Sequence, residues 1–492
     1  MRRGGRASSG SRRPPSTTPR APEKLRGGRR LQDDRPAARA IVRFPPVPSI
    51  RPFRALRYSH ELVQDLATVV APPYDVISPE EHRRLLARDP RNVVRLDLPE
   101  EQPGDPEDER YRRAARTVSA WRSDGTLRRD VRPALYPYEQ TYRVPGAERT
   151  ATRRGIFARV VLEPFGPTSG IRAHERTLAE PREDRYRLLR ATSVNTSPVV
   201  GLGEDRTGLV PEWLREVAAT PPIAELVDDA EVSHRLWMAA VGADEERDKA
   251  ISAVCERLGA NSITLADGHH RYETALRFSE ERRRGPALEE EPAWAEILML
   301  VLEPVEGALT VLPTHRVLLG LAARGVEAFV SRVPELFEVE RGISRERLLE
   351  AFDGSTEARG GEGRMGLWTR HGGAILHARR AAFVPWLPAG GSALRRLDVT
   401  LASVAIEHLA GIDAGAVAEG RIAYTMDAAE AIEWVDGGAA PTGTQPASAA
   451  LLLEPTQASE IVAVAADGDV MPQKSTYIYP KALSGLVINP LE

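Results

Sequence analysis

The sequence contains a single cysteine, Cys255, among its 492 residues. One cysteine cannot form a disulfide within the chain, and it cannot build a structural zinc site from several thiolates. Long hydrophobic runs are also missing, because stretches such as Ile297–Leu302 fall far short of the roughly 20 residues that span a bilayer. No apolar segment typical of a secretory signal stands at the N-terminus. We therefore expect a soluble, cytoplasmic protein without membrane contact, in which Cys255 packs in a helix core and is no nucleophile.

Net charge is small as well, at −3, but it is unevenly distributed. Residues 1–43 hold thirteen Lys and Arg against three Asp and Glu, whereas the rest of the chain holds 54 basic and 67 acidic residues. Because the chain beyond residue 43 is acidic, its overall charge argues against nucleic-acid binding by that part. Nucleic acid could therefore bind only through the basic segment. Because this segment has few apolar residues, we predict a disordered basic tail over 1–43.

Composition and element pattern indicate a mixed α/β protein of several domains. Hydrophobic residues make up 42% and charged residues 28%, as in globular proteins. A length of 492 residues suggests two to four domains at about 100–200 residues each. The predicted regions beyond the tail are an N-terminal α/β region over 44–235, a central region over 236–320 and a C-terminal α/β region over 321–492.

Local signals predict individual elements. Ser78 before Pro79 is typical of a capped helix start, and strands over 134–144 and 155–162 should form a hairpin. Residues 174–200 are expected to be a polar, charged stretch. Further helices are predicted over 111–122, 212–217, 244–258, 272–283, 345–352, 393–410, 427–435 and 456–465. Further strands are predicted over 232–237, 263–266, 296–302, 309–312, 422–425, 449–453 and 477–479.

The turn between the strand 263–266 and the helix 272–283 is the strongest candidate site. It reads Asp-Gly-His-His-Arg, and a helix start offers free N–H groups and a positive dipole end that bind anions. Gly268 permits close approach of a ligand, Arg271 suits bidentate phosphate recognition, and Asp267 could hold Mg²⁺ beside the phosphate. The alternative is an Asp N-cap followed by surface histidines and an ion-paired arginine. Because these polar and charged residues stand directly beside one another, we favour a binding or catalytic role over this alternative.

Two further segments carry candidate acid and metal groups. Glu175 could act as a general base for a hydroxyl, with His174 beside it as a metal ligand or phosphate donor, or both could belong to a solvated charged loop. Asp75 follows two prolines in a rigid turn, where it could bind a metal, although Asp is common in turns.

Cationic groups also follow two strands. His315 and Arg316 come after the strand 309–312, and open α/β sheets bind ligands at strand ends. The alternative is a strand-terminal His with a capping Thr. Lys474 and Lys481 flank a segment that lacks the glycines of a phosphate loop but is rich in phosphate-compatible groups.

Taken together, these blocks resemble the prokaryotic family called domain of unknown function 1015. They cover nearly everything except the basic tail. The blocks that carry the resemblance are Arg51–Arg57, Ala71–Val76, His174–Thr177, Asp184–Arg185, Asn195–Pro198, Ala266–Glu273, Leu312–Arg316, Met471–Lys481 and Ser484–Val487.

A shorter resemblance covers about 60 residues. The strand–turn–helix element is similar to the motif of the ParB/sulfiredoxin-like fold, which includes ParB segregation proteins, sulfiredoxins and a free serine kinase that uses ADP. The resemblance implies a nucleotide-binding core, elaborated here with additional α/β regions. It also implies phosphate binding by His269–Arg271 and, by similarity to the kinase, a role for Asp267 near metal and substrate. Sulfiredoxin has a Cys in this turn where the chain has His, which argues against sulfinic-acid repair.

The leading hypothesis is a Mg²⁺-dependent phosphotransfer enzyme that acts on a small hydroxylated metabolite, such as serine, with ADP or ATP. The alternatives are a phosphatase of a metabolite such as phosphoserine and a ParB-like nucleotide-sensing or DNA-binding adaptor. The predicted catalytic residues are Glu175, Asp267, His269 and His270. The predicted nucleotide- and phosphate-binding residues are Gly268, His269, His270, Arg271, His315, Arg316, Lys474, Ser475, Thr476 and Lys481. The predicted metal ligands are Asp75 and Asp267.

Overall fold

A computed structural model describes most of the chain beyond its N-terminus. The described residues are 48–166, 169–175, 179–283, 292–303, 309–352, 362–440 and 445–492. Contacts divide the chain into residues 1–44 and residues 45–492, and every described residue belongs to the second unit. The predicted basic tail over 1–43 lies outside the described residues.

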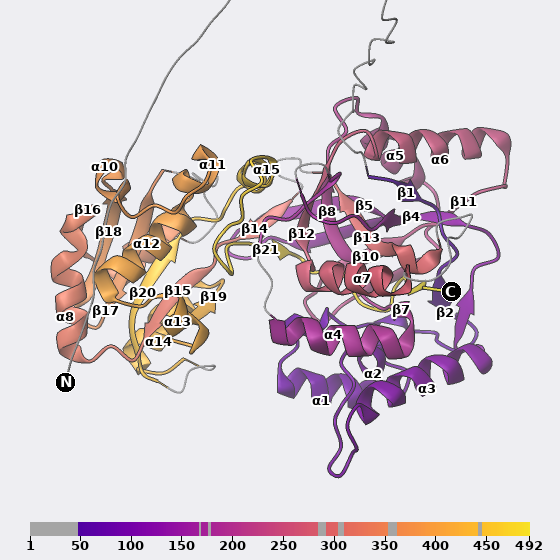
Figure 1. The fold of residues 1–492 in the computed structure, drawn as a ribbon, viewed down its shortest axis with the longest axis horizontal. Coiled ribbons are helices and arrows are strands. Elements are labelled where there is room, and N and C mark those ends of the chain that lie inside the picture. Colours follow the sequence, from indigo (N-terminus) through magenta and orange to yellow (C-terminus); the bar gives the residue numbers. More distant parts are fainter. Residues whose placement is uncertain are drawn as a thin grey trace, which may run out of the picture. The chain divides into compact units, whose positions relative to one another are not determined.

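The larger sheet has ten strands (Figure 1). Its strands are β1 (Ile50–Arg51), β4 (Ala134–Arg143), β5 (Thr150–Val161), β6 (Ile171–Arg172), β8 (Val199–Gly203), β9 (Ala224–Val227), β10 (Ser233–Leu236), β11 (Ala239–Ala240), β12 (Ile263–Asp267) and β13 (Glu296–Leu302). The order is β6-β12-β8-β13-β5-β4-β10-β9, with β1 beside β5 and β11 beside β4. The pairs β12–β6 and β13–β8 are parallel, and the others are antiparallel.

Both faces of this sheet are covered, which explains why every residue of β13 is buried. Side chains alternate between faces along a strand. Met299 packs in a core with α5, α6 and α7, whereas Leu300 packs in the core that includes residues 482–488. The helices of this part are α1 (Pro79–Arg88), α2 (Val94–Asp97), α3 (Glu109–Ser123), α4 (Ala179–Thr192), α5 (Leu209–Ala218), α6 (Glu245–Leu258) and α7 (His269–Arg282), with 3-10 turns at Leu66–Thr68, Tyr74–Val76 and Ala293–Ala295.

A second, antiparallel sheet has six strands between two helical layers. Its order is β16 (Phe337–Ile343), β18 (Gly372–Ala378), β17 (Arg364–Thr369), β20 (Ala447–Leu453), β15 (His315–Leu319) and β19 (Ile422–Thr425). Leu451 of β20 packs in the core that includes α12, and its neighbour Leu452 packs in the core that includes α14. The helices are α8 (Ala323–Arg332), α9 (Arg345–Phe352), α10 (Arg380–Phe383), α11 (Ser392–Arg396), α12 (Asp398–Ala410), α13 (Ala414–Ala418), α14 (Ala428–Gly437) and α15 (Ala458–Ala466), with a 3-10 turn at Val333–Glu335.

Three two-stranded pairs complete the fold. They are β2 (Leu56–Tyr58) with β3 (Leu127–Arg129), β14 (Thr310–Leu312) with β21 (Tyr477–Tyr479), and β7 (Val194–Asn195) with β22 (Asn489–Pro490). The last two pairs fix the C-terminal segment at both of its ends. This segment therefore returns to the part of the chain that carries the ten-stranded sheet.

Most predicted elements are confirmed, and so is the mixed α/β class. The hydroxyl of Ser78 accepts a hydrogen bond from the N–H of Glu81 at 3.1 Å, as a helix cap should. Strands 134–144 and 155–162 form the predicted hairpin. The helix after the Asp-Gly turn begins at His269, three residues before the predicted start. Strands from the predicted regions 44–235 and 236–320 share one sheet, and the boundaries between those regions stay predictions.

One helix was not predicted, and one prediction holds only in part. The stretch 174–200 is polar and charged as predicted, but it also contains the helix α4, whose charged side chains outnumber its apolar ones and pair with neighbouring elements. His315 and Arg316 follow the strand β14 as predicted, but they begin the inner strand β15 and do not stand at an open strand end. The strands β16, β17 and β18 were not predicted. Within the described ranges, no helix combines the length and the apolar character needed to cross a bilayer.

One buried carboxylate joins three segments that are distant in sequence. Asp97 is 4% exposed and accepts hydrogen bonds from the hydroxyls of Thr196 at 2.7 Å, Ser197 at 2.8 Å and Ser484 at 2.9 Å. A buried carboxylate is tolerated only when its oxygens are hydrogen-bonded. Asp97 therefore explains structurally why hydroxyl side chains occupy positions 196, 197 and 484.

Replacing Asp97 with Ala should destabilise the fold by about 3 kcal/mol, because three buried hydroxyls lose their acceptor. Urea unfolding followed by circular dichroism measures this change. Asp229→Ala is the control, since its exposed carboxylate pairs with Arg84 and Arg88 and should contribute less than about 1 kcal/mol. Equal unfolding midpoints for the two variants would contradict the structural role of Asp97.

Candidate functional site

The candidate site begins where β12 ends and α7 starts. Gly268 stands between them with φ of 87°, a left-handed conformation that favours glycine. A Cβ at this position would also lie 3.1 Å from the guanidinium of Arg271. Asp267 and Arg271 are four residues apart across this turn, so their side chains meet on one side of the first helical turn.

The carboxylate of Asp267 lies between two cations. Its Oδ1 accepts a hydrogen bond from Lys481 Nζ at 2.6 Å, and its Oδ2 accepts one from Arg271 Nη2 at 2.7 Å. All three side chains are largely buried, at 12–14% exposure. Burial raises the pKa of Asp267, but attraction to Lys481 and Arg271 outweighs it and holds that pKa well below its ordinary value. The group is therefore an ionised carboxylate with both oxygens paired.

Lys481 is positioned by the segment in which it lies. Its ammonium stands 4.4 Å from the ring centroid of Tyr477, a cation–π contact. Its backbone carbonyl accepts a hydrogen bond from Gln140 at 3.1 Å. Arg153 donates to the carbonyls of Tyr479 and Pro480 and to Gln140. β4 and β5 thus hold this segment against the end of β12.

Two buried histidines lie beside the Asp267 turn. The rings of His174 and His269 meet edge to face, with centroids 4.6 Å apart. His174 Nδ1 donates to the carbonyl of Leu265 at 2.5 Å, and its Nε2 accepts from the Thr476 hydroxyl at 3.1 Å. Burial lowers the pKa of His174 to about 4 and the pKa of His269 well below its ordinary value. His174 is therefore neutral, with both ring nitrogens engaged, and its position suits packing better than metal ligation.

Glu175 is the candidate base and lies against the C-terminal segment. Its Oε1 accepts a hydrogen bond from the backbone N–H of Lys474 at 3.1 Å. The neighbouring carbonyl of His174 accepts one from the N–H of Met471 at 2.7 Å. Burial raises the pKa of Glu175, and the Lys474 N–H only partly offsets this effect. A carboxylate with a raised pKa takes up a proton more readily near neutral pH.

The other residues predicted in this segment have different surroundings. Ser475 is buried, and its hydroxyl donates to the carbonyl of Pro472 at 2.5 Å, so it stabilises the turn. Lys474 is exposed, and its side chain makes no hydrogen bond or ion pair among the described residues. It lies close enough to Glu175 and His270 to lower the pKa of both.

Asp75 and His270 lie at the same place in the fold. Asp75 is exposed in the 3-10 turn Tyr74–Val76, and its charge raises the pKa of Lys481, Arg271 and His270. Burial is the largest influence on His270 and leaves its pKa below the ordinary value. Asp75 thus faces the same cations as Asp267.

The two predicted metal ligands differ in how well they fit a metal ion. Within the described ranges, no three His, Cys, Asp or Glu side chains are grouped to hold a metal. Asp267 does not fit Mg²⁺, because both its oxygens are already paired with cations. Asp75 makes no hydrogen bond or ion pair within the described part of the chain. It fits a Mg²⁺ that takes one protein carboxylate and otherwise ligand phosphates and water.

His315 and Arg316 are the predicted residues that the structure keeps apart from Asp267. His315 Nδ1 accepts the N–H of Leu453 at 3.1 Å, and Arg316 Nη1 donates to the Val399 carbonyl and the Ser403 hydroxyl, both at 2.9 Å. Both side chains are buried in the six-stranded sheet and its helix α12. Their contacts therefore stabilise that part of the fold.

Tyr424 is a further residue near the site, and no sequence motif pointed to it. This half-buried residue of β19 pairs with Arg316 across the sheet. Burial raises the pKa of its hydroxyl, while Arg316 lowers it and Glu175 raises it further. Tyr424 thus interacts electrostatically both with Arg316 of the inner strand β15 and with Glu175. A single Tyr in a short strand forms no sequence motif, so its position near Glu175 could not be predicted.

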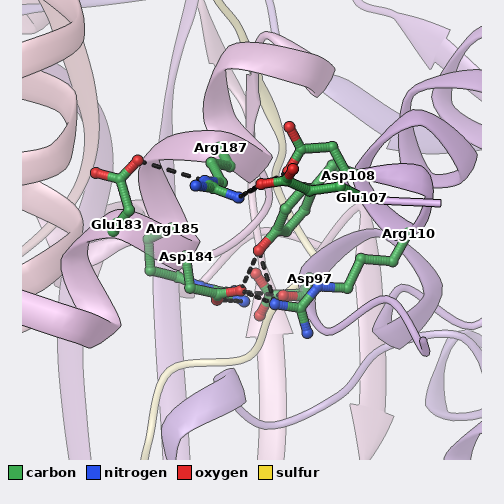
Figure 2. A network of polar contacts seen from close by, with 9 residues as sticks. Asp97, Glu107, Asp108, Arg110, Glu183, Asp184, Arg185 and Arg187 are labelled. Atoms are coloured by element: carbon green, nitrogen blue, oxygen red, sulfur yellow. Dashed lines mark hydrogen bonds and ion pairs between the residues drawn. The ribbon is translucent and has the colours of Figure 1, made fainter. Parts of the chain in front are cut away.

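A small cavity of about 50 Å³ lies beside the first turn of α7. Its lining includes Tyr74, Asp97, Arg185 and Arg271. Arg185 stacks on the Tyr74 ring at 4.0 Å and pairs with Asp184. Figure 2 shows Arg185 and Arg110 approaching Asp184 and Arg187 reaching Glu183 and Glu107 in the same network. These charges pair with one another, so the network joins α3 to α4.

These features define a mixed α/β protein with a cationic candidate site at the start of α7. The chain belongs to the family described as protein of unknown function DUF1015, whose profile matches residues 50–400. No protein with a curated function matches the sequence.

Among solved structures, the chain is similar to a conserved hypothetical protein from Pyrococcus furiosus, with 13% identity and a TM-score of 0.30 over 64% of this chain and 89% of that one. It is similar to a free serine kinase in complex with AMP, with 13% identity and a TM-score of 0.32 over 68% and 90%. A third is SbnI from Staphylococcus aureus, truncated at its C-terminus, with 12% identity and a TM-score of 0.29 over 65% and 84%.

His174 should make stability depend on pH in acid. Its pKa is about 4 in the folded protein against an ordinary 6.5. Between these two pH values His174 is protonated in the unfolded chain and neutral in the folded protein. The stability it contributes is complete above pH 6.5 and is lost as the pH falls toward 4, by about 3 kcal/mol. His174→Gln should flatten urea stability against pH in this window. A ¹⁵N NMR titration placing the His174 pKa near 6.5 would contradict this assignment.

Proposed function

We propose that this protein is a phosphotransferase that moves a phosphoryl group between a nucleotide and a small hydroxylated metabolite, such as serine. The observation that supports this function best is the convergence of Lys481 and Arg271 at the start of α7, with Glu175 on the adjoining segment. Phosphoryl transfer requires positioned cations and a group that accepts the hydroxyl proton. Three sequence segments supply these groups.

Phosphate binding would use the first turn of α7. The N–H groups after Gly268 and the positive end of the helix dipole favour an anion there. Arg271 and Lys481 add two permanent positive charges, and the exposed Lys474 adds a third. The similarity of this turn to the ParB/sulfiredoxin-like motif agrees with phosphate binding and stays a prediction.

Glu175 would act as the general base. In the transfer step the metabolite hydroxyl oxygen attacks the terminal phosphorus, and the bond from that phosphorus to the leaving nucleotide oxygen breaks. The hydroxyl proton passes to the Glu175 carboxylate. Burial raises the pKa of this group toward neutral pH, which suits a residue that must gain and then lose a proton.

Mg²⁺ would be held by Asp75 together with phosphate oxygens of the nucleotide. When bound, it would supply positive charge to the transferring phosphoryl group. Asp267, paired with Lys481 and Arg271, would instead hold these two cations in place. His174 and His269, both neutral, would pack behind the turn.

ADP or ATP with Mg²⁺ should raise the melting temperature of the full chain by a few degrees, because a ligand that binds only the folded state stabilises it. The double variant Arg271→Ala, Lys481→Ala should lose this shift. Lys249→Ala is the matched control, since it removes an exposed lysine that pairs with Glu245 on α6. A chain that no nucleotide stabilises would contradict the kinase. Release of phosphate from phosphoserine without nucleotide would identify the phosphatase instead.

Glu175→Gln should reduce kcat at least about 100-fold with little change in the nucleotide KM, because it removes the base and keeps the shape. Phosphoryl transfer from ³²P-labelled ATP to serine measures this loss. Glu183→Gln on α4 is the control, since its carboxylate pairs with Arg277 on the helix surface and should leave kcat unchanged. Full activity of Glu175→Gln would contradict the assignment of the base.

A further inference from the structure

Asp267 places one negative charge between two cations before any ligand is bound. Lys481 and Arg271 each place one N–H on a different oxygen of the same carboxylate, at 2.6 and 2.7 Å. The two cations are the groups best placed to hold a phosphate at the start of α7. Asp267 therefore occupies with its carboxylate the position between them that an anion would need.

Acid cannot remove this internal anion within the ordinary pH range. Attraction to Lys481 and Arg271 outweighs burial and keeps the pKa of Asp267 well below its usual value. The remaining ways to free the two cations are displacement of the carboxylate by another anion and substitution of Asp267. Because charges interact more strongly away from water, burial strengthens the attraction of Lys481 and Arg271 for whichever anion lies between them.

We propose that Asp267 is a resident counter-ion, which a phosphate dianion displaces from Lys481 and Arg271 when it binds. This inference rests on the phosphate site of the proposed function and names its ligand class. Two positive charges match a dianionic phosphate, whereas one remaining negative charge on Asp267 would repel it. Binding is thus an exchange of one anion for another between the same two cations.

The exchange makes an unusual prediction about Asp267. A carboxylate that only assists phosphate binding would weaken that binding when removed. A carboxylate that competes with phosphate would strengthen it. Asp267→Asn keeps the size of the side chain and removes the charge, so it separates the two roles.

The test is calorimetric titration of the full chain with inorganic phosphate alone at pH 8. Asp267→Asn should bind phosphate at least 10-fold more tightly than the unmodified protein. Adding Lys481→Gln to Asp267→Asn should cancel most of the gain. Asp267→Ser is a second variant that should show the same direction if the Asn variant folds poorly, and far-UV circular dichroism checks folding of each protein.

Asp75→Asn is the matched control for overall charge. It also removes one negative charge that acts on Lys481 and Arg271, but its carboxylate pairs with neither. The proposal requires a larger gain for Asp267→Asn than for Asp75→Asn. Equal gains would show a general charge effect and overturn the exchange, as would unchanged or weaker binding by both Asp267 variants.

The protonation state of the ligand gives a second readout. Phosphate loses much of its second negative charge as the pH falls toward 5.5, whereas sulfate keeps both. Phosphate affinity of Asp267→Asn should therefore fall at least 3-fold from pH 8 to pH 5.5 relative to sulfate affinity. Parallel behaviour of the two anions would overturn the preference for a phosphate dianion.

The exchange and the proposed function can fail separately. Tighter phosphate binding by Asp267→Asn in a protein that transfers no phosphoryl group supports the exchange and removes the phosphotransferase. Phosphoryl transfer by the unmodified protein without any gain in Asp267→Asn supports the phosphotransferase and removes the exchange.

Discussion

The ion pairs of Asp267 with Lys481 and Arg271 hold the candidate site together. Asp267 ends a strand of the ten-stranded sheet, Arg271 belongs to the helix that follows, and Lys481 comes from a segment 214 residues later in the chain. Largely buried charges are stable only when they are paired. Loss of Asp267 would leave two largely buried cations without their shared partner, and loss of Lys481 would remove the ion pair that joins the C-terminal segment to the end of β12.

The same region contains both ionised and neutral titratable groups. Lys481, Arg271 and Asp267 are ionised because each has a partner at hydrogen-bond distance. His174 and His269 lie as close to the turn but are kept neutral by burial. Glu175 lies between these extremes, since burial favours its neutral form and one backbone N–H favours its carboxylate. The permanent charges proposed to bind phosphate and the titratable group proposed to accept a proton thus come from neighbouring segments.

Sequence reasoning succeeded where local chemistry fixes local structure. The apolar run at Ile263, the glycine at 268 and the polar residues after it specify a strand, a left-handed turn and a helix start without help from the rest of the fold. It failed at α4, where charged residues pair with other elements and leave too weak an apolar periodicity. It also misplaced His315 and Arg316, because a Pro-Thr break after Leu312 looks the same whether the chain ends a strand or enters another sheet.

The sequence by itself determined the mixed α/β class and the family, and it predicted an anion-binding turn after β12, since these depend on motifs and near neighbours. The tertiary structure decided which distant groups share the site: Lys481, Thr476 and the Lys474 backbone meet it, whereas His315 and Arg316 are buried in the six-stranded sheet. It also decided that Asp267 is paired with cations, whereas Asp75 has no hydrogen-bond or ion-pair partner in the described part of the chain. The physical reason is that ion pairing depends on separation in space, and separation along the chain does not predict it.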